Sequence, residues 1–461
     1  MTNVIVPDYY TPDDIQYNAK PVKRTKFWCM IAGFMALIFI RNVIAIEYPI
    51  VILLAYACGM AVFCDHDEII ALAVSFVPLF AAFQYRYALL VLLVIYALKY
   101  FDNLKKINLN VYIPLLLMMC WELLHGIVGE FSFVSFLQGF SELIFCTFVI
   151  SLPNKKFEFG FIARVLAICV VFSCSVLLIK LLQTTNFDFN EVFLSGNYRF
   201  GVSDKEETSY VMNYNANELG YICNLSIIGL ILRMRKVGIN ITDACLIGSL
   251  VFFGSLTLSR SFVLCLALIV VMFIFAFAKN IGNVVKGVAA VSVIIFVLLF
   301  VLNLTVPFVL ENIVSRFNED DVTGGRSSLM ELYGDFIFSS PMILFLGIGV
   351  QNILKKASTI NPNIFGVPHN GTQQLIVAWG IIGLVLFCYF LMFIVSESRK
   401  KVKRQKFENY IPIIMILIVA QAGQLITSGS KLMLLYFAYV VLCTEFDPRR
   451  YEMENDNHEF V

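Results

Sequence analysis

The sequence predicts an all-α polytopic integral membrane protein with about 14 transmembrane helices and a large helical external loop before the third-last span. Its composition is one reason: of 461 residues, 59% are hydrophobic and 15% are charged, and the mean hydropathy is +0.81. Soluble domains are less apolar than this. The apolar runs are also long and continuous, without the alternation typical of barrel strands, so helices are the expected spanning elements.

A span needs about 20 mostly apolar residues, and the runs of this length set the predicted elements. The spans are expected at 27–46, 48–64, 68–83, 87–101, 110–128, 133–152, 158–182, 214–232, 241–258, 261–278, 287–306, 373–396, 410–427 and 431–445. They divide the chain into a cytoplasmic tail (1–26), N-terminal transmembrane helices (27–182), a first external loop (183–213), transmembrane helices (214–306), a large external catalytic loop (307–372), C-terminal transmembrane helices (373–445) and a cytoplasmic tail (446–461).

Lys and Arg residues in the short connections predict the orientation, because cytoplasmic loops are enriched in them. With the N-terminus inside, most of the 34 Lys and Arg residues fall on the cytoplasmic side, including the cluster "SRKKVKRQK" at 398–406. Both termini are then cytoplasmic, and the two large loops are external.

The sequence gives no sign of a cofactor. Neither large external loop contains any of the 12 cysteines, and no Cys/His spacing typical of a metal site occurs. Nucleotide-binding and hydrolase motifs are also missing from the sequence. We therefore expect neither a metal nor a nucleotide cofactor.

The candidate functional residues are polar groups on the predicted external face. Arginine offers a planar donor fork that suits phosphate oxygens, and histidine can exchange a proton near neutral pH. The candidates are Arg199 in "GNYRFG", Arg260 in "LTLSRSF", Arg316 and Arg326 in the second loop, and His369 with Asn370 at its end.

Several of these residues also have a plain structural interpretation. Arg260 could mark a span end, and Arg316 could pair with the acidic residues of "NEDD" beside it. Asn370 could cap the span that begins after it. Lys355 and Lys356 are predicted to form a solvated face of the loop.

Part of the large loop is predicted to be helical. "RSSLMELYGDFIF" has apolar residues at 329, 333, 336 and 337, which lie on one helical face. Gly324 and Gly325 precede this stretch and Pro341 follows it, so we expect a helix over 326–338 along the membrane surface. "PMILFLGIGVQN" is too short to span and is expected to dip into the interface.

The order of motifs resembles the O-antigen ligase/polymerase superfamily, whose members are membrane glycosyltransferases. The resemblance covers roughly 195–395. It rests on "NANELG", "SRS", "GGR", "LGIGV", "HN" and "GIIG" in that order. The chain differs in "HNGTQQ" and "VAW", where an aromatic residue, a leucine and an acidic residue are usual.

The resemblance implies the roles of the site residues. His369, Arg260 and Arg326 would be catalytic, and Arg199, Asn217, Arg316 and Asn370 would bind substrate. It further implies an external site in the bacterial inner membrane and no metal or cofactor. The implied partners are an undecaprenyl-diphosphate-linked oligosaccharide and membrane lipids, with flippase and chain-length regulator proteins as further candidates and no nucleic acid.

Within this superfamily, the number of spans and the large loop favour a polymerase of lipid-linked repeat units over an O-antigen ligase. A lipid-linked oligosaccharide flippase is the alternative from another class. It is disfavoured because no repeated half is visible and the intramembrane groups Glu122, Glu142, Arg164 and Lys180 have no obvious partners in the sequence. A scaffold role would leave the external arginines unexplained.

Overall fold

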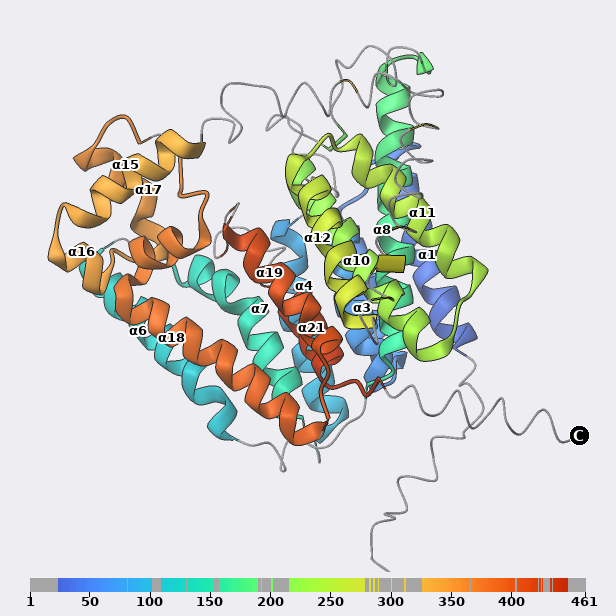
Figure 1. Ribbon diagram of the computed structural model, residues 1–461, viewed down its shortest axis with the longest axis horizontal. Coiled ribbons are helices and arrows are strands. Elements are labelled where there is room, and N and C mark those ends of the chain that lie inside the picture. Colours follow the sequence, from blue (N-terminus) through green and yellow to red (C-terminus); the bar gives the residue numbers. More distant parts are fainter. Residues whose placement is uncertain are drawn as a thin grey trace, which may run out of the picture.

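The computed structural model shows a bundle of helices with a small group of helices on one side of it (Figure 1). It describes residues 24–80, 82–101, 109–129, 131–152, 157–189, 192, 200–201, 215–277, 282, 285–286, 289, 300, 311, 326–364, 366–402, 404–421, 423, 425, 432 and 434–446. Only the backbone is described at 82–87, 138, 277, 326 and 360.

Helices are the regular elements of the described residues. The first half contains α1 (Thr25–Asn42), α2 (Ile50–Phe63), α3 (His66–Leu79), α4 (Ala82–Lys99), η2 (Leu109–Tyr112), α6 (Ile113–Val128), α7 (Phe133–Ser151) and α8 (Phe159–Thr184). The second half contains α10 (Ala216–Val237), α11 (Ile241–Leu256), α12 (Arg260–Phe277), α15 (Arg326–Phe338), α16 (Pro341–Leu346), η3 (Val350–Asn352), α17 (Ile353–Ile360), α18 (Gly371–Lys401), α19 (Phe407–Gln421) and α21 (Leu435–Leu442).

The centre of the bundle consists of helices that are apolar on all sides. Every residue of α3 from Ile69 to Leu79 is buried, and so is every residue of α21. Helix α8 packs against both α3 and α10. A helix without a polar face has no surface suited to water, so these helices are stable only in the interior.

Peripheral helices expose large apolar side chains instead. On α6, Leu116, Leu124, Ile127 and Val128 are all more than half exposed. Exposing such side chains to water would be unfavourable, whereas the hydrocarbon core of a bilayer suits them. The exposed apolar surface therefore agrees with the prediction that the chain spans a membrane.

The predicted spans are confirmed in part. Each one overlaps a described helix, except 287–306, which lies almost entirely outside the described residues. Five described helices are long and apolar enough to cross a membrane, and the structure also contains shorter apolar helices of 10–17 residues. The described part of the chain is therefore that of a helical membrane protein, and the count of about 14 spans stays a prediction.

Contacts at one end of the bundle agree with the predicted antiparallel order. At one end, Arg24 before α1 contacts Asp65 before α3 at 2.8 Å and Glu158 before α8 at 2.6 Å. Arg24 belongs to the predicted cytoplasmic tail, Asp65 to a predicted cytoplasmic connection, and Glu158 is the first residue of a span predicted to begin on the same side. We call this the inner end, and the opposite end, where the predicted external loops begin, the outer end.

Arg164 has a partner, so the interpretation of the intramembrane charges from the sequence was wrong for this residue. Its guanidinium lies 2.9 Å from Asp243 at the start of α11, and Arg233 at the end of α10 contacts the same buried carboxylate. The partner is 79 positions away in the sequence, which is why it was not recognised there.

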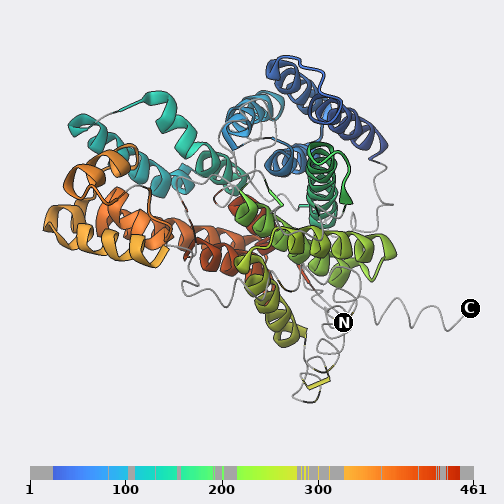
Figure 2. The same cartoon turned by 90° about the horizontal axis from the view of Figure 1, so that it is seen from above.

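Helices α15, α16 and α17 form a group at the outer end (Figure 1), on the side of α6 and α18 and away from α1 (Figure 2). Residues 326–338 form a single helix, as predicted. The next helix, α16, packs against α18. The described part of the large loop is thus an ordered cap on one side of the bundle.

Candidate functional site

The structure describes the surroundings of only some of the predicted site residues. Arg199 and Arg316 lie outside the described residues, and the backbone alone is described for Arg326, the first residue of α15. Asn217, Arg260, His369 and Asn370 are described with their side chains and lie at the starts of α10, α12 and α18.

Arg260 begins α12 directly after a tight turn from α11. Leu258 in this turn has a φ of 48°, a left-handed conformation that is uncommon for a residue with a side chain. Phe262 then packs so closely over Gly254 that a Cβ there would overlap its ring. This contact fixes the conformation of the turn and thus the place where α12 begins. Arg260, the first residue of α12, is half-buried.

Amide and hydroxyl groups join this turn to α10. Asn215 caps α10 and accepts a hydrogen bond from the Asn217 N–H at 2.9 Å. The Ser259 hydroxyl donates to the Asn217 side-chain oxygen at 2.8 Å and lies 2.7 Å from the Ser261 hydroxyl. Asn217 is thus hydrogen-bonded to Ser259, the residue directly before Arg260.

His369 lies one residue before the cap of α18 and is half-buried. The side-chain oxygen of Asn370 accepts from the Gln373 N–H at 3.0 Å, and its amide nitrogen donates to the Gln421 carbonyl at 3.1 Å. The capping interpretation of Asn370 is therefore confirmed. Both side-chain polar atoms of Asn370 already serve the fold, while its substrate contact stays a prediction.

Helix α19 connects the two halves of the candidate site. It packs against α12, which begins at Arg260, and against α18, which follows His369. Its last residue, Gln421, also accepts a hydrogen bond from the Thr372 hydroxyl at 2.9 Å. Helix α19 therefore contacts both helices that begin at candidate site residues, and its last residue is bonded to the start of α18.

Helix α15 lies beside the His369 segment. The Gln373 side chain donates to the Met330 carbonyl at 2.8 Å, and the Tyr333 hydroxyl donates to the Gly366 carbonyl at 2.7 Å. Burial raises the pKa of the Tyr333 phenol, so its hydroxyl stays protonated as a donor. Arg326 is one helical turn, about 6 Å, before Met330, which contacts Gln373 in the first turn of α18.

The motif "LGIGV" packs against a break in helix α18. Gly380 has a φ of 69° within α18 and divides it into a short outer piece and a long inner piece. A Cβ at Gly380 would overlap the Phe345 carbonyl, and a Cβ at Gly347 would lie 2.5 Å from the Ala378 oxygen. Two glycines from distant motifs therefore allow two backbones to pass in direct contact.

Breaking a helix leaves carbonyl groups without helical partners, and this loop supplies donors for them. Ile348 N–H donates to the Val377 carbonyl at 2.9 Å, and Gly349 N–H donates to the Ala378 carbonyl at 2.7 Å. The Trp121 indole of α6 donates to the Trp379 carbonyl at 3.0 Å. The loop and the broken helix thus form one unit.

A buried carboxylate completes this junction. Glu122 of α6 accepts from the Trp379 indole at 2.7 Å and from the Val350 N–H at 3.1 Å. One turn further along α6, His125 lies 2.8 Å from the Leu346 carbonyl. Sequence reasoning gave Glu122 no partner, because Trp379 is 257 positions away.

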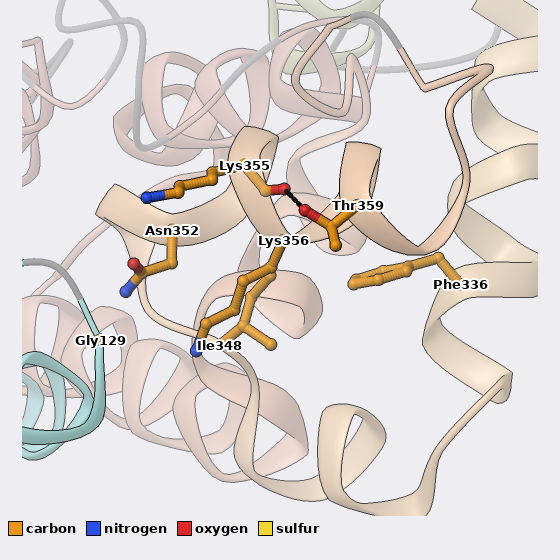
Figure 3. Close-up of a pocket in the computed structure, with 7 residues that line it drawn as sticks. All are labelled: Gly129, Phe336, Ile348, Asn352, Lys355, Lys356 and Thr359. Carbon is orange, nitrogen blue, oxygen red and sulfur yellow. Dashed lines mark hydrogen bonds between the residues drawn. The ribbon is translucent and has the colours of Figure 1, made fainter.

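A cavity of about 480 Å³ opens beside this junction. It lies between α15, α17 and the end of α6, and both lysine side chains of α17 extend toward the side on which Gly129 lies (Figure 3). Lys355 is exposed, as the sequence predicts, but it lines a cavity rather than a plain solvated face. The lining residues are Gly129, Phe336, Ile348, Asn352, Lys355, Lys356 and Thr359.

The chemistry of these groups suits an anionic, partly apolar ligand. Arginine and lysine at the outer end can neutralise phosphate oxygens, and His369 can accept a proton. In the described part of the chain, no three His, Cys, Asp or Glu side chains are grouped so that they could hold a metal ion.

Comparison with known proteins supports the resemblance drawn from the sequence. No curated protein matches the chain. The family model described as "O-Antigen ligase" matches residues 244–388, a segment that contains Arg260, Arg326 and His369 together with the interlocking glycine motifs. This match supports activity of the O-antigen ligase or polymerase type, and it confirms the resemblance of this membrane protein to the O-antigen ligase/polymerase superfamily.

Proposed function

We propose that this protein is a polymerase of undecaprenyl-diphosphate-linked oligosaccharide repeat units, and that it acts on the external face of the bacterial inner membrane. The family match over 244–388 is the observation that carries the proposal, because it spans Arg260, Arg316, Arg326, His369 and Asn370. The choice of a polymerase rests on the large number of predicted spans and the large external loop.

In this reaction the growing glycan leaves one lipid carrier and joins the next lipid-linked repeat. The bond between the anomeric carbon and the diphosphate oxygen breaks, and its electron pair remains on the diphosphate. Arg260, Arg326 and Arg199 neutralise the charge that develops there. Fixed donors of this kind contribute several kcal/mol in a partly dry site.

The acceptor is a sugar hydroxyl of the incoming repeat. Its oxygen forms the new bond to the anomeric carbon, and its proton passes to His369. The position of His369 supports this role, because the capped start of α18 and helix α15 hold the segment on two sides. Asn217, Arg316 and Asn370 are proposed to contact the sugars or the diphosphate.

Complementation of a cell that lacks this protein tests the proposal. Surface polysaccharide would be separated by gel electrophoresis, and lipid-linked glycans would be extracted from the membrane. We expect the wild type to restore a ladder of long chains, and His369→Ala to leave single repeats on the final acceptor. His458→Ala, in the C-terminal tail, is the matched control and should restore the ladder.

An O-antigen ligase is the second candidate, because the matching family model carries that description. A ligase would transfer the finished glycan to a lipid core sugar. Cells without a ligase would accumulate full-length chains on the lipid carrier, whereas cells without a polymerase would accumulate single repeats. Accumulation of full-length carrier-linked chains in the deletion strain would therefore replace the polymerase assignment with that of a ligase.

A further inference from the structure

The cavity between α15, α17 and the end of α6 combines an apolar wall with two cationic side chains. Phe336 and Ile348 form buried parts of its lining, and Lys355 and Lys356 extend along it (Figure 3). Ammonium groups attract phosphate oxygens, while the apolar wall suits a hydrocarbon chain. A ligand that fits both parts is an amphiphile with an anionic head.

Apolar side chains next to the cavity face outward. Val128, which precedes the lining residue Gly129, is 79% exposed, and Phe338, two residues after Phe336, is 77% exposed. Leu354 beside Lys355 is also exposed. Val128 belongs to the exposed apolar surface of α6, and all three side chains give the cavity apolar neighbours that suit entry of a ligand sideways from the membrane.

The polymerase reaction places different demands on its two substrates. The reacting carbon of the donor is bonded to its own diphosphate, so the donor diphosphate must lie next to His369. The reacting hydroxyl of the acceptor belongs to the far end of its oligosaccharide, several sugars away from its own diphosphate. The acceptor diphosphate therefore needs a separate anchor at some distance from the proton acceptor.

We propose that the cavity lined by Lys355 and Lys356 binds the carrier diphosphate of the acceptor, the incoming lipid-linked repeat. Helix α15 provides the separation, because Arg326 begins it and Phe336 lies ten residues later, about 15 Å along its axis. The acceptor glycan would extend along α15 from the cavity to His369. This proposal rests on the proposed polymerase function.

The transfer step leaves the acceptor diphosphate unchanged. The acceptor hydroxyl oxygen gains the bond to the donor's anomeric carbon, His369 takes the proton, and the donor carrier leaves as the free diphosphate. The lysines therefore bind but do not take part in the chemistry. Their loss should weaken acceptor binding and leave the maximal rate of transfer nearly unchanged.

Photo-crosslinking of the full-length protein in lipid nanodiscs tests binding directly. A benzoylphenylalanine would replace Phe336 in the cavity wall, and radiolabelled undecaprenyl diphosphate would be the probe. We expect a crosslink that an excess of unlabelled undecaprenyl diphosphate removes and an equal excess of phosphatidylglycerol does not. The double variant Lys355→Gln/Lys356→Gln should reduce capture at least about fivefold, since it removes two charge contacts.

Kinetics on the same preparations separate the two substrates. In Lys355→Gln/Lys356→Gln the KM for a single lipid-linked repeat should rise about tenfold, with kcat and the KM for a long donor chain nearly unchanged. Lys400→Gln, at the inner end, is the matched control and should change none of these values. Thermal unfolding of each variant would show that the proteins are folded.

The possible results distinguish the two proposals. Efficient competition by phosphatidylglycerol would make the cavity a general phospholipid site and overturn the inference. Polymerisation by the wild type, together with no crosslink at position 336 or with equal changes of both KM values in Lys355→Gln/Lys356→Gln, would overturn the inference and leave the polymerase function intact. A crosslink at position 336, together with no polymer from the wild type, would overturn the polymerase function and with it the acceptor role.

Discussion

At the inner end of the bundle, charged side chains connect the helices, whereas at the outer end backbone contacts, amides and hydroxyls connect them. Arg24 bridges Asp65 and Glu158, and Asp243 lies between two arginines. At the outer end, the bonds of Asn217 to Ser259 and of Asn370 to Gln421 join neutral groups. Arginines at the inner end thus have clear structural roles.

This difference bears on the candidate site. Neutral hydrogen bonds and glycine contacts hold the segments that contain Arg260 and His369. An outer end assembled in this way can present basic groups to an anionic substrate. The comparison leads to three predictions, of which two concern how each end is held together and one concerns the site itself.

The largest effect is expected at the interlock of the outer end, by which we mean the backbone contact between the loop at Gly347 and the break of α18 at Gly380. Gly380→Ala adds a Cβ at a φ of 69°, in overlap with the Phe345 carbonyl. Since both the backbone conformation and the contact are lost, we expect destabilisation of about 4 kcal/mol or more and little folded protein. Fluorescence-detected size-exclusion chromatography after heating would measure it.

Gly248→Ala is the control for this prediction. Gly248 lies in α11, and a Cβ there would meet nothing within 4 Å. Its elution profile and melting temperature should match those of the wild type. Normal expression and melting of Gly380→Ala would show that the interlock does not hold the outer end together.

A smaller effect is expected at the inner end. Asp243 is fully buried between Arg164 and Arg233, and Asp243→Ala leaves both arginines without this carboxylate. Removing one member of a buried charge cluster typically costs about 3 kcal/mol. The melting temperature should fall clearly, while transfer activity per folded molecule stays close to that of the wild type. A selective loss of activity instead would contradict a purely structural inner end.

Local sequence patterns predicted the structural features that depend on residues close together in the sequence. The apolar face at 329, 333, 336 and 337 gave the helix α15, and the residue type of Asn370 gave the cap of α18. Both features depend on contacts within a few positions of each other. The match over 244–388 likewise follows from motif order in the sequence.

Contacts between distant segments could not be predicted in this way. Glu122 gave no sign that Trp379 and Val350 would donate to it, and "GIIG" gave no sign that Gly380 breaks its helix. The role of Lys355 and Lys356 depends on Phe336 and Gly129 meeting them in space. Such features need the three-dimensional arrangement, because no local pattern encodes them.

The smallest of the three effects is expected at Arg260, where a substitution should remove about 2 to 3 kcal/mol of transition-state stabilisation. Arg260→Lys keeps the positive charge but removes the planar donor fork, so transfer should slow about 100-fold with the melting temperature nearly unchanged. Arg235→Lys at the inner end is the matched control: Arg235 lies 3.8 Å from Glu408, a contact that lysine can replace with little change in rate. Polymerisation rates of the purified variants would measure both effects. Equal rates for the two variants would contradict a role of Arg260 in binding the substrate. They would mean that Arg260 stabilises the fold, as the arginines at the inner end do, because only a bound ligand that needs the planar donor fork would make Arg260→Lys slower than Arg235→Lys.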